Sequence, residues 1–187
     1  MQIRSLFSAV EVENRVAELA EQLYRDYADS PLAILAIAEG AVRFTEALVG
    51  ALAGRGLRPH VQTVQARRTS GTEIGAVQIE SFDVATLDDC DVLVVDDVAD
   101  EGRTLRAVLE LVSLSDCRSV KTAVLVNKRN SRREPIQLDY VGFEVESGWV
   151  VGFGMDIDGE LRDLDEIGVV DESDPGQPSS SRRRSKG

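Results

Sequence analysis

The chain has 187 residues, a length that suits one domain with a substantial hydrophobic core. Hydrophobic residues make up 43% of the sequence and charged residues 29%, which is typical of a globular protein, and no apolar run approaches the ~20 residues that a membrane span needs. The formal net charge of -12 argues against sequence-independent binding of nucleic acid, because such binding needs a basic surface.

Two further features of the sequence bear on the compartment. Cys90 and Cys117 have neither metal-binding nor redox spacing, which indicates a reducing environment. The N-terminal stretch "MQIRSLFSAVEVEN" lacks the apolar core of a signal peptide. We therefore expect a cytoplasmic protein that does not associate with a membrane.

The first predicted element is a helix over residues 8–27. Ser8 and Glu11 have the spacing of a capping box, in which each residue satisfies a backbone N–H at the helix start. Apolar residues then recur at the spacing of one helix face. These apolar residues are Val12, Val16, Leu19, Leu23 and Tyr27.

Strands and helices alternate along the rest of the chain. The continuous apolar run 32–38 predicts a strand that is buried on both faces, and 42–56 predicts a helix that stops at its glycines. The polar stretch 67–74 predicts a loop between two strands. The other predicted strands span 60–66, 75–80, 91–97, 121–128, 139–145 and 149–156, with a further helix at 103–112.

This alternation predicts an α/β fold, with a parallel sheet flanked by helices on both faces. Ligands of such sheets bind beyond the carboxyl ends of the strands, where Asp96, Asp97 and Lys128 are expected to lie. We expect residues 1–170 to form one domain. Residues 171–187 are rich in Ser, Pro, Gly and charge, which predicts a disordered tail.

The stretch "VLVVDDVADEGRTL", residues 92–105, combines a buried strand, acidic residues and the start of a helix. Its loop can bind phosphate through free backbone N–H groups at the helix N-terminus, to which Thr104 adds a hydroxyl. The carboxylates then suit sugar hydroxyls or a hard metal ion. The chain has neither a Walker loop nor a dinucleotide-binding glycine motif, so the stretch predicts a phosphorylated sugar as ligand.

Each of these residues also has a purely structural interpretation. Asp96 and Asp97 could cap the following helix. Lys128 could be a surface lysine, and Trp149 could pack in the core. Glu39 could be a carboxylate that a helix N-terminus favours.

The stretch 92–105 resembles the phosphoribosyl-pyrophosphate motif of the type I phosphoribosyltransferases. A second segment, "VLVNKRNSRREPIQLDYVGFEVESGWVVGFGMDIDGELRDL", resembles the carboxyl-terminal hood of the hypoxanthine-guanine members of that family. The resemblance runs from about residue 32 to residue 164. It implies a type I phosphoribosyltransferase fold with a small hood built mainly from the C-terminal strands.

The resemblance also implies roles at the base end of the site. Asp100 would face N7 of a purine and act in proton transfer, which a carboxylate can do. Lys128 would donate to the exocyclic oxygen of a 6-oxopurine, because a lysine always donates. Trp149 would stack on the base, a contact that contributes ~1–3 kcal/mol, and Val150 would offer backbone groups to the base edge.

At the phosphate end, the resemblance implies that Asp96 and Asp97 hold the ribose hydroxyls, directly or through magnesium. Metal ions and cations there would stabilise the charge that develops as pyrophosphate leaves. The other implied assignments are Glu101, Gly102, Arg103 and Thr104 in the 5'-phosphate loop, Glu39 and Gly40 in the pyrophosphate loop, Asp156 at a second magnesium ion, and Arg162 at pyrophosphate.

The departures from the family pattern cluster at the phosphate end. Glu39 stands where the family has lysine, Ala41 stands at its second loop glycine, and Glu101 replaces Ser or Thr. Arg68 and Thr69 stand where the family's mobile loop has a Ser-Tyr pair. Each added carboxylate would repel a phosphate charge at ~5 Å by roughly 3 kcal/mol at an effective dielectric of ~20.

Two explanations of this repulsion remain open from the sequence. Arg67, Arg68 and Arg103 could offset it, or Glu101 could point to solvent while its backbone N–H still serves the phosphate. The loop that contains Arg67 and Arg68 could be simply a solvated loop, but we favour a lid over the active site.

We therefore expect a magnesium-dependent transferase that joins a 6-oxopurine to phosphoribosyl pyrophosphate, releases pyrophosphate and forms inosine or guanosine monophosphate. The resemblance also implies a dimer or tetramer. One alternative is a related transferase in specialised metabolism with a different base or sugar donor. The other is a non-catalytic nucleotide-binding or regulatory protein, which the carboxylates at the phosphate end would suit.

Overall fold

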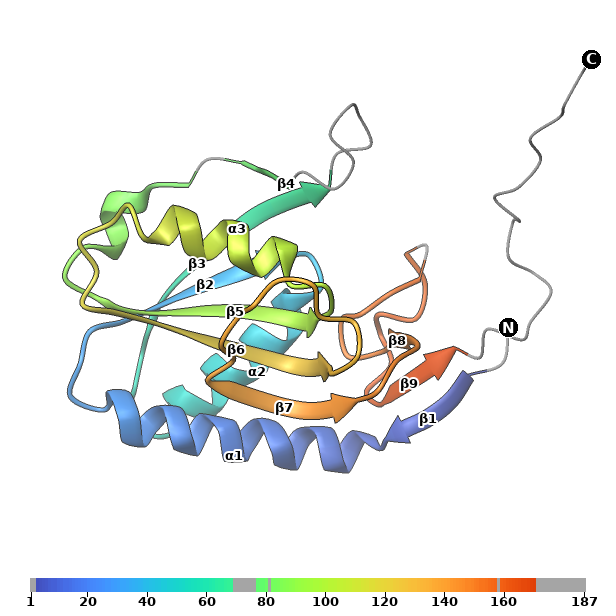
Figure 1. The fold of residues 1–187 in the computed structure, drawn as a ribbon. Helices are drawn as coiled ribbons and strands as arrows, with labels where there is room; N and C mark the ends of the chain where they lie inside the picture. Colours follow the sequence, from blue (N-terminus) through green and yellow to red (C-terminus); the bar gives the residue numbers. More distant parts are fainter. Residues whose placement is uncertain (1–2, 69–76, 81, 158, 171–187) are drawn as a thin grey trace, which may run out of the picture.

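The computed structural model describes residues 3–68, 77–80, 82–157 and 159–170 (Figure 1). The predicted tail 171–187 and most of the predicted loop 67–74 lie outside the described residues, as do the side chains of Arg67 and Arg68. Within the described part of the chain, no helix is long and apolar enough to cross a membrane.

A six-stranded sheet in the order β4-β3-β2-β5-β6-β7 forms the centre of the fold. All neighbours in it are parallel except β4, which pairs antiparallel with β3 at the edge. The mainly parallel sheet confirms the predicted α/β class. The strands are β2 Leu32–Ala38, β3 His60–Arg68, β4 Val77–Ile79, β5 Asp91–Ala99, β6 Ser119–Lys128 and β7 Tyr140–Val145.

Helices cover both faces of this sheet, as predicted (Figure 1). Helices α1 (Ala9–Tyr27) and α2 (Ala41–Ala53) bury their apolar residues with one set of strand side chains, and α3 (Arg103–Val112) does so with the other set. A short 3-10 helix, η1 (Val84–Leu87), precedes β5. Alternate side chains of β2 and β5 point to opposite faces, so both strands are buried on both sides.

The start of α1 has the predicted capping box. The Ser8 hydroxyl accepts from the backbone N–H of Glu11, and the Glu11 carboxylate accepts from the Ser8 backbone N–H. All five apolar residues that the sequence placed on one helix face are buried. Local sequence therefore determines both the start of this helix and the face that it buries.

A three-stranded antiparallel sheet in the order β1-β9-β8 forms the hood. Its strands are β1 (Ile3–Phe7), β9 (Ile167–Val170) and β8 (Trp149–Val151). In Figure 1 the arrowheads of β5, β6 and β7 point toward this hood.

Three details of the strand prediction need correction. The hood consists mainly of the C-terminal strands β8 and β9, as expected, but also contains β1, which was not predicted; the predicted strand 139–145, part of the hood-like segment, is β7 of the central sheet. The predicted strand 149–156 ends at Val151, because glycine-rich turns with positive φ at Gly152 and Gly154 follow it. The predicted strand 91–97 continues to Ala99, where it still pairs with Asn127 of β6.

Candidate active site at the carboxyl ends of the strands

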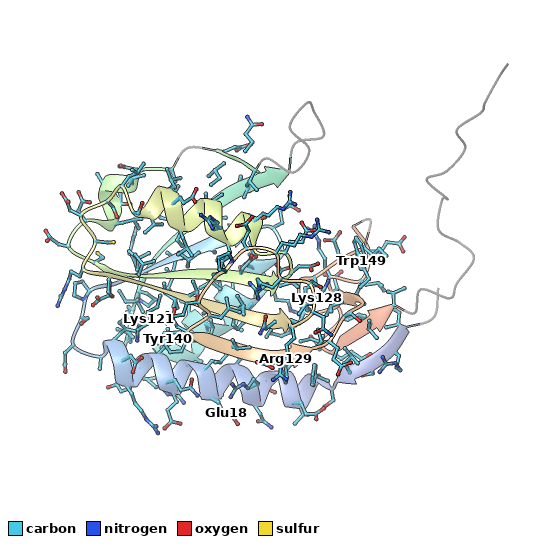
Figure 2. The ribbon with its side chains drawn as sticks, in the orientation of Figure 1. Glu18, Lys121, Lys128, Arg129, Tyr140 and Trp149 are labelled. Carbon is cyan, nitrogen blue, oxygen red and sulfur yellow. The ribbon has the colours of Figure 1, made fainter. Side chains whose placement is uncertain are left out.

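Lys128 and Asp100 form an ion pair at the carboxyl end of the central sheet. The Lys128 Nζ lies 2.9 Å from Oδ2 of Asp100, which immediately follows β5. Lys128 is buried, with 11% of its side chain exposed, so the alternative of a surface lysine is wrong. Figure 2 shows Lys128 near the hood, at the opposite end of the sheet from Lys121 and Tyr140.

The two aspartates of β5 differ in their surroundings. Asp96 is buried, and its Oδ1 accepts from the Asp97 backbone N–H at 3.0 Å. The Asp97 carboxylate lies against the loop after β2, where a Cβ on Gly40 would approach its Oδ2 to 1.8 Å. Only glycine leaves room for that carboxylate, so Gly40 and Asp97 are packed as one unit across neighbouring strands.

The loop from β5 to α3 has the geometry of an anion-binding helix start. Gly102 is the N-cap of α3, adopts φ 89° and supplies no side-chain cap to the first N–H groups. Arg103 and Thr104 form the first turn that follows. Backbone N–H groups and the helix dipole at such a terminus favour a bound phosphate.

The Glu101 carboxylate is held by arginines on both sides. Its Oε2 lies 3.3 Å from Nε of Arg103, and its Oε1 lies 3.1 Å from Nε of Arg133. Only 24% of the Glu101 side chain is exposed. The structure thus favours charge compensation over a solvent-facing carboxylate, with Arg103 as a predicted partner and Arg133 as an unexpected one.

Arg132 is a site residue that the sequence analysis missed. Its Nη2 donates to Oδ1 of Asn127 at 2.6 Å, whereas its buried Nη1 has no hydrogen-bond partner among the described residues. Burial lowers the pKa of this guanidinium, and the negative charge of Asp100 acts in the opposite direction. Arg132, Asp100, Glu101 and neighbouring residues line a cavity of about 370 Å³. The basic run after the strand, "KRNSRR", was the available signal.

Trp149 and Val150 begin the strand β8. The Trp149 side chain is not in the core, because the residue is 55% exposed, and Figure 2 shows it on the hood on the same side as Lys128. Its Nε1 donates a long hydrogen bond of 3.5 Å to the Asp156 carbonyl. Val150 is buried and pairs with Val169 of β9, so the hood fixes the backbone beside an exposed aromatic face.

Arg162 connects the hood to the loop after β2. Its Nη1 donates to Oε2 of Glu39 at 2.7 Å, and its Nη2 donates to Oδ1 of Asp156 at 2.9 Å. The hydrogen bond that Arg162 donates to Glu39, followed by the one that it donates to Asp156, raises the pKa of the guanidinium. The structure therefore brings Arg162 and Asp156, which are neighbours in sequence, to Glu39, which precedes both by more than a hundred positions.

Magnesium is the metal that the resemblance implies. No cluster of three or more metal-binding side chains exists within the described residues, and both Asp156 carboxylate oxygens already accept hydrogen bonds, from Arg162 and Gly159. Magnesium usually binds one or two carboxylates together with waters and substrate phosphates. The carboxylates of Asp96 and Asp97 fit that mode of binding, in which the substrate supplies part of the coordination.

Comparison with known proteins gives consistent results. The model of the phosphoribosyl transferase domain matches residues 3–158. Hypoxanthine-guanine phosphoribosyltransferase from Bacillus subtilis is 32% identical over 166 residues, which cover 88% of this chain and 91% of that protein. The corresponding protein from Mycobacterium tuberculosis is 30% identical over 89% of this chain and 85% of its own length.

Solved structures agree with the sequence relatives. A hypoxanthine phosphoribosyltransferase from Staphylococcus aureus superposes with a TM-score of 0.83 at 26% identity, covering 90% of this chain and 91% of that one. The Trypanosoma cruzi enzyme in complex with its product IMP also gives 0.83, at 27% identity over 90% and 94% of the two chains. The chain therefore belongs to the phosphoribosyltransferase family.

Proposed function

We propose that this protein transfers the phosphoribosyl group of phosphoribosyl pyrophosphate to a 6-oxopurine of the hypoxanthine or guanine type, with release of pyrophosphate. The observation that carries the proposal is the buried Lys128 ammonium, 2.9 Å from the carboxylate of Asp100, which is two residues before Gly102, the N-cap of α3. This juxtaposes a donor for a carbonyl oxygen, an acceptor for a ring proton and a phosphate-binding loop. The hypoxanthine-guanine enzymes among the relatives support the same choice.

At the base end, each residue has one role in this proposal. Lys128 donates to the 6-oxo group, and Asp100 accepts the proton that the purine loses at N7 as its ring attacks the sugar. The exposed ring of Trp149 stacks on the base, and the backbone at Val150 contacts the base edge. The Lys128–Asp100 pair separates as the base enters, so that each partner exchanges one charged contact for a contact to substrate.

At the phosphate end, the residues bind phosphoribosyl pyrophosphate. The N–H groups at Gly102, Arg103 and Thr104 bind the 5'-phosphate, while the Glu101 carboxylate is neutralised by its arginines. The 39–40 loop and Arg162 face the pyrophosphate. Asp96 and Asp97 orient the ribose hydroxyls and would hold magnesium, which would supply charge stabilisation to the departing pyrophosphate. A second magnesium ion at Asp156 would share carboxylate oxygens that already accept hydrogen bonds from Arg162 and Gly159.

We also propose the wider organisation of the protein. Residues 1–170 form the catalytic domain and 171–187 a disordered tail. The free thiols of Cys90 and Cys117 support a cytoplasmic location. An oligomeric state is described for the T. cruzi relative, and we propose a dimer or tetramer here, which sedimentation analysis would test.

A second candidate function has one observation in its favour. Glu39 forms an ion pair with Arg162, and Glu101 forms one with Arg103. Both arginines would otherwise be free to bind the phosphates of phosphoribosyl pyrophosphate. A non-catalytic nucleotide-binding protein tolerates such pairs, because it has no pyrophosphate to bind.

A turnover assay separates the two functions. Hypoxanthine, guanine and xanthine are each supplied with phosphoribosyl pyrophosphate and magnesium, with the Asp100→Asn variant measured in parallel. We expect nucleotide from the native protein and a loss of about 100-fold or more in the variant, since general acid-base groups contribute about that factor. A folded native protein that binds a purine nucleotide but forms no product from any of the three bases would refute the transferase proposal.

A further inference from the structure

The loop after β2 and the hood are joined by a carboxylate bridge, defined here as Glu39, Arg162 and Asp156. Both guanidinium ends of Arg162 are engaged, at 2.7 Å to Glu39 and 2.9 Å to Asp156. Its Nε is buried and has no hydrogen-bond partner among the described residues. A cation at the phosphate end of the site is therefore neutralised by this chain's own carboxylates before any substrate arrives.

The backbone of Arg162 is held more firmly than its side chain. Its backbone carbonyl accepts from the Gly154 N–H at 3.0 Å and from Nη1 of Arg43 at 3.0 Å. The Arg43 side chain is held in place by other contacts: the same nitrogen donates to the Leu164 carbonyl, and the guanidinium lies 4.8 Å from the centre of the Phe153 ring. The backbone of Arg162 is thus fixed, and only its side chain can change partners.

The contact to Glu39 is the more displaceable arm of the bridge. The Glu39 side chain is 63% exposed, whereas that of Asp156 is 26% exposed and also accepts from the Gly159 N–H at 2.7 Å. Exposed ion pairs are weak, because water and salt screen them. An anion that approaches Arg162 from the site will therefore displace Glu39 rather than Asp156.

We propose that Glu39 competes with the pyrophosphate group of the phosphoribosyl donor for Arg162 and so sets the affinity for pyrophosphate. The inference rests on the proposed function and concerns a position where the resembling family has lysine. In the free protein Glu39 forms an ion pair with Arg162. When pyrophosphate displaces it, the Glu39 carboxylate stays nearby and repels the bound anion. It thereby weakens the binding of pyrophosphate and donor, promotes the release of pyrophosphate, and leaves the base end unaffected.

The test measures the binding of inorganic pyrophosphate with magnesium, by calorimetry, to the native protein and to Glu39→Gln. The variant keeps the shape of the side chain and removes its charge. We expect pyrophosphate to bind about five- to tenfold more tightly, an effect that shrinks in high salt. In steady-state assays the KM for phosphoribosyl pyrophosphate should fall by a similar factor, while the KM for the base stays unchanged.

Glu21→Gln is the matched control, because Glu21 pairs with Arg25 on the exposed face of α1. It removes one carboxylate from an ion pair without touching the site, and we expect no change in pyrophosphate affinity. Glu39→Lys supplies a second test at the same position, with pyrophosphate binding tighter than in Glu39→Gln. Equal tightening in Glu21→Gln and Glu39→Gln would indicate a general charge effect and overturn the proposal.

The outcomes also separate this inference from the proposed function. Tighter pyrophosphate binding by Glu39→Gln without turnover of any purine supports the role of Glu39 and contradicts the purine transferase. Turnover by the native protein together with unchanged or weaker pyrophosphate binding by Glu39→Gln overturns the role of Glu39 alone. A lower melting temperature with unchanged affinity would make the bridge merely structural, and would also overturn it.

Discussion

The two ends of the site differ in their ion pairs. At the base end, one lysine and one carboxylate face each other across 2.9 Å. At the phosphate end, Glu39 and Glu101 each contact an arginine. The predicted electrostatic repulsion is therefore met by local ion pairs, which leaves the binding of anions dependent on how easily these pairs open.

Trp149 provides a test at the base end. Because 55% of the residue is exposed, Trp149→Ala should change the melting temperature little. Loss of a stacking contact of about 1–3 kcal/mol should raise the KM for the base by about five- to 150-fold. Trp149→Phe should keep most of the affinity, and steady-state kinetics with a thermal melt measures both effects. A large fall in melting temperature with an unchanged KM would contradict the stacking role.

Gly40 provides a test at the phosphate end. In Gly40→Ala the new methyl group would overlap the Asp97 carboxylate, so the aspartate or the loop must move. We expect kcat/KM for the donor to fall by about 100-fold, the effect of a small misplacement of catalytic groups. Gly50→Ala is the control, because outside the backbone of its own helix no described atom lies within 4 Å of the added carbon, and alanine favours a helix interior. Equal activity of the two variants would argue against the packing of Gly40 on Asp97.

The positions of the site residues were more predictable than their partners. Asp96, Asp97 and Lys128 lie at the carboxyl ends of the neighbouring parallel strands β5 and β6, where the strand prediction placed them. The pairing of Glu39 with Arg162 joins positions 123 apart and depends on the path of the chain after β8, which no local pattern encodes. Arg132 and Arg133 were missed because their segment has no periodic pattern.

At the scale of elements, the long helices and buried strands were predicted and two short strands were not. The apolar stripe and capping box of α1 are local signals. By contrast, β1 and β9 have five and four residues, and they become strands by pairing with each other from opposite ends of the chain. Short strands of this kind depend on non-local pairing, so their propensity alone carries little information.

The capping box of α1 gives a prediction that depends on pH. Hydrogen bonds from the Ser8 side chain, and then from its backbone, lower the pKa of Glu11. A carboxyl group with a lowered folded pKa stabilises the fold above its unfolded pKa, and this stability is lost as the pH falls through the folded pKa. Ser8→Ala should cost about 1 kcal/mol near pH 7, and the difference should shrink below about pH 4.

Urea unfolding at pH 7 and pH 3 measures this difference. Glu11→Gln is the companion variant, because it keeps a hydrogen-bonding side chain that does not titrate. We expect the difference in unfolding free energy between Glu11→Gln and the native protein to be smaller at pH 3 than at pH 7. A difference between Ser8→Ala and the native protein that is as large at pH 3 as at pH 7 would show that the ionised carboxylate does not contribute.

At the scale of the whole molecule, metal dependence should belong to substrate binding and not to the fold. The described residues contain no cluster that could hold a metal without help. Removal of magnesium with a chelator should therefore leave the melting temperature of the free protein unchanged. It should abolish turnover and the stabilisation that the donor gives, since a ligand stabilises only the state that binds it. A chelator that unfolds the protein would contradict this prediction.

The hood has a consequence for the synthesis of the protein. Its central strand, β9, ends at Val170 and pairs on one side with β1, which begins at Ile3. On a ribosome β1 must therefore wait for β9 to be made, whereas every strand of the central sheet precedes β9 in sequence and can pair earlier. A prematurely terminated chain that ends before Ile167 would carry the residues of the phosphate-binding loop but no assembled hood. The sheet that carries Trp149 is thus the last part of the site to form, and it forms only after translation has passed Val170.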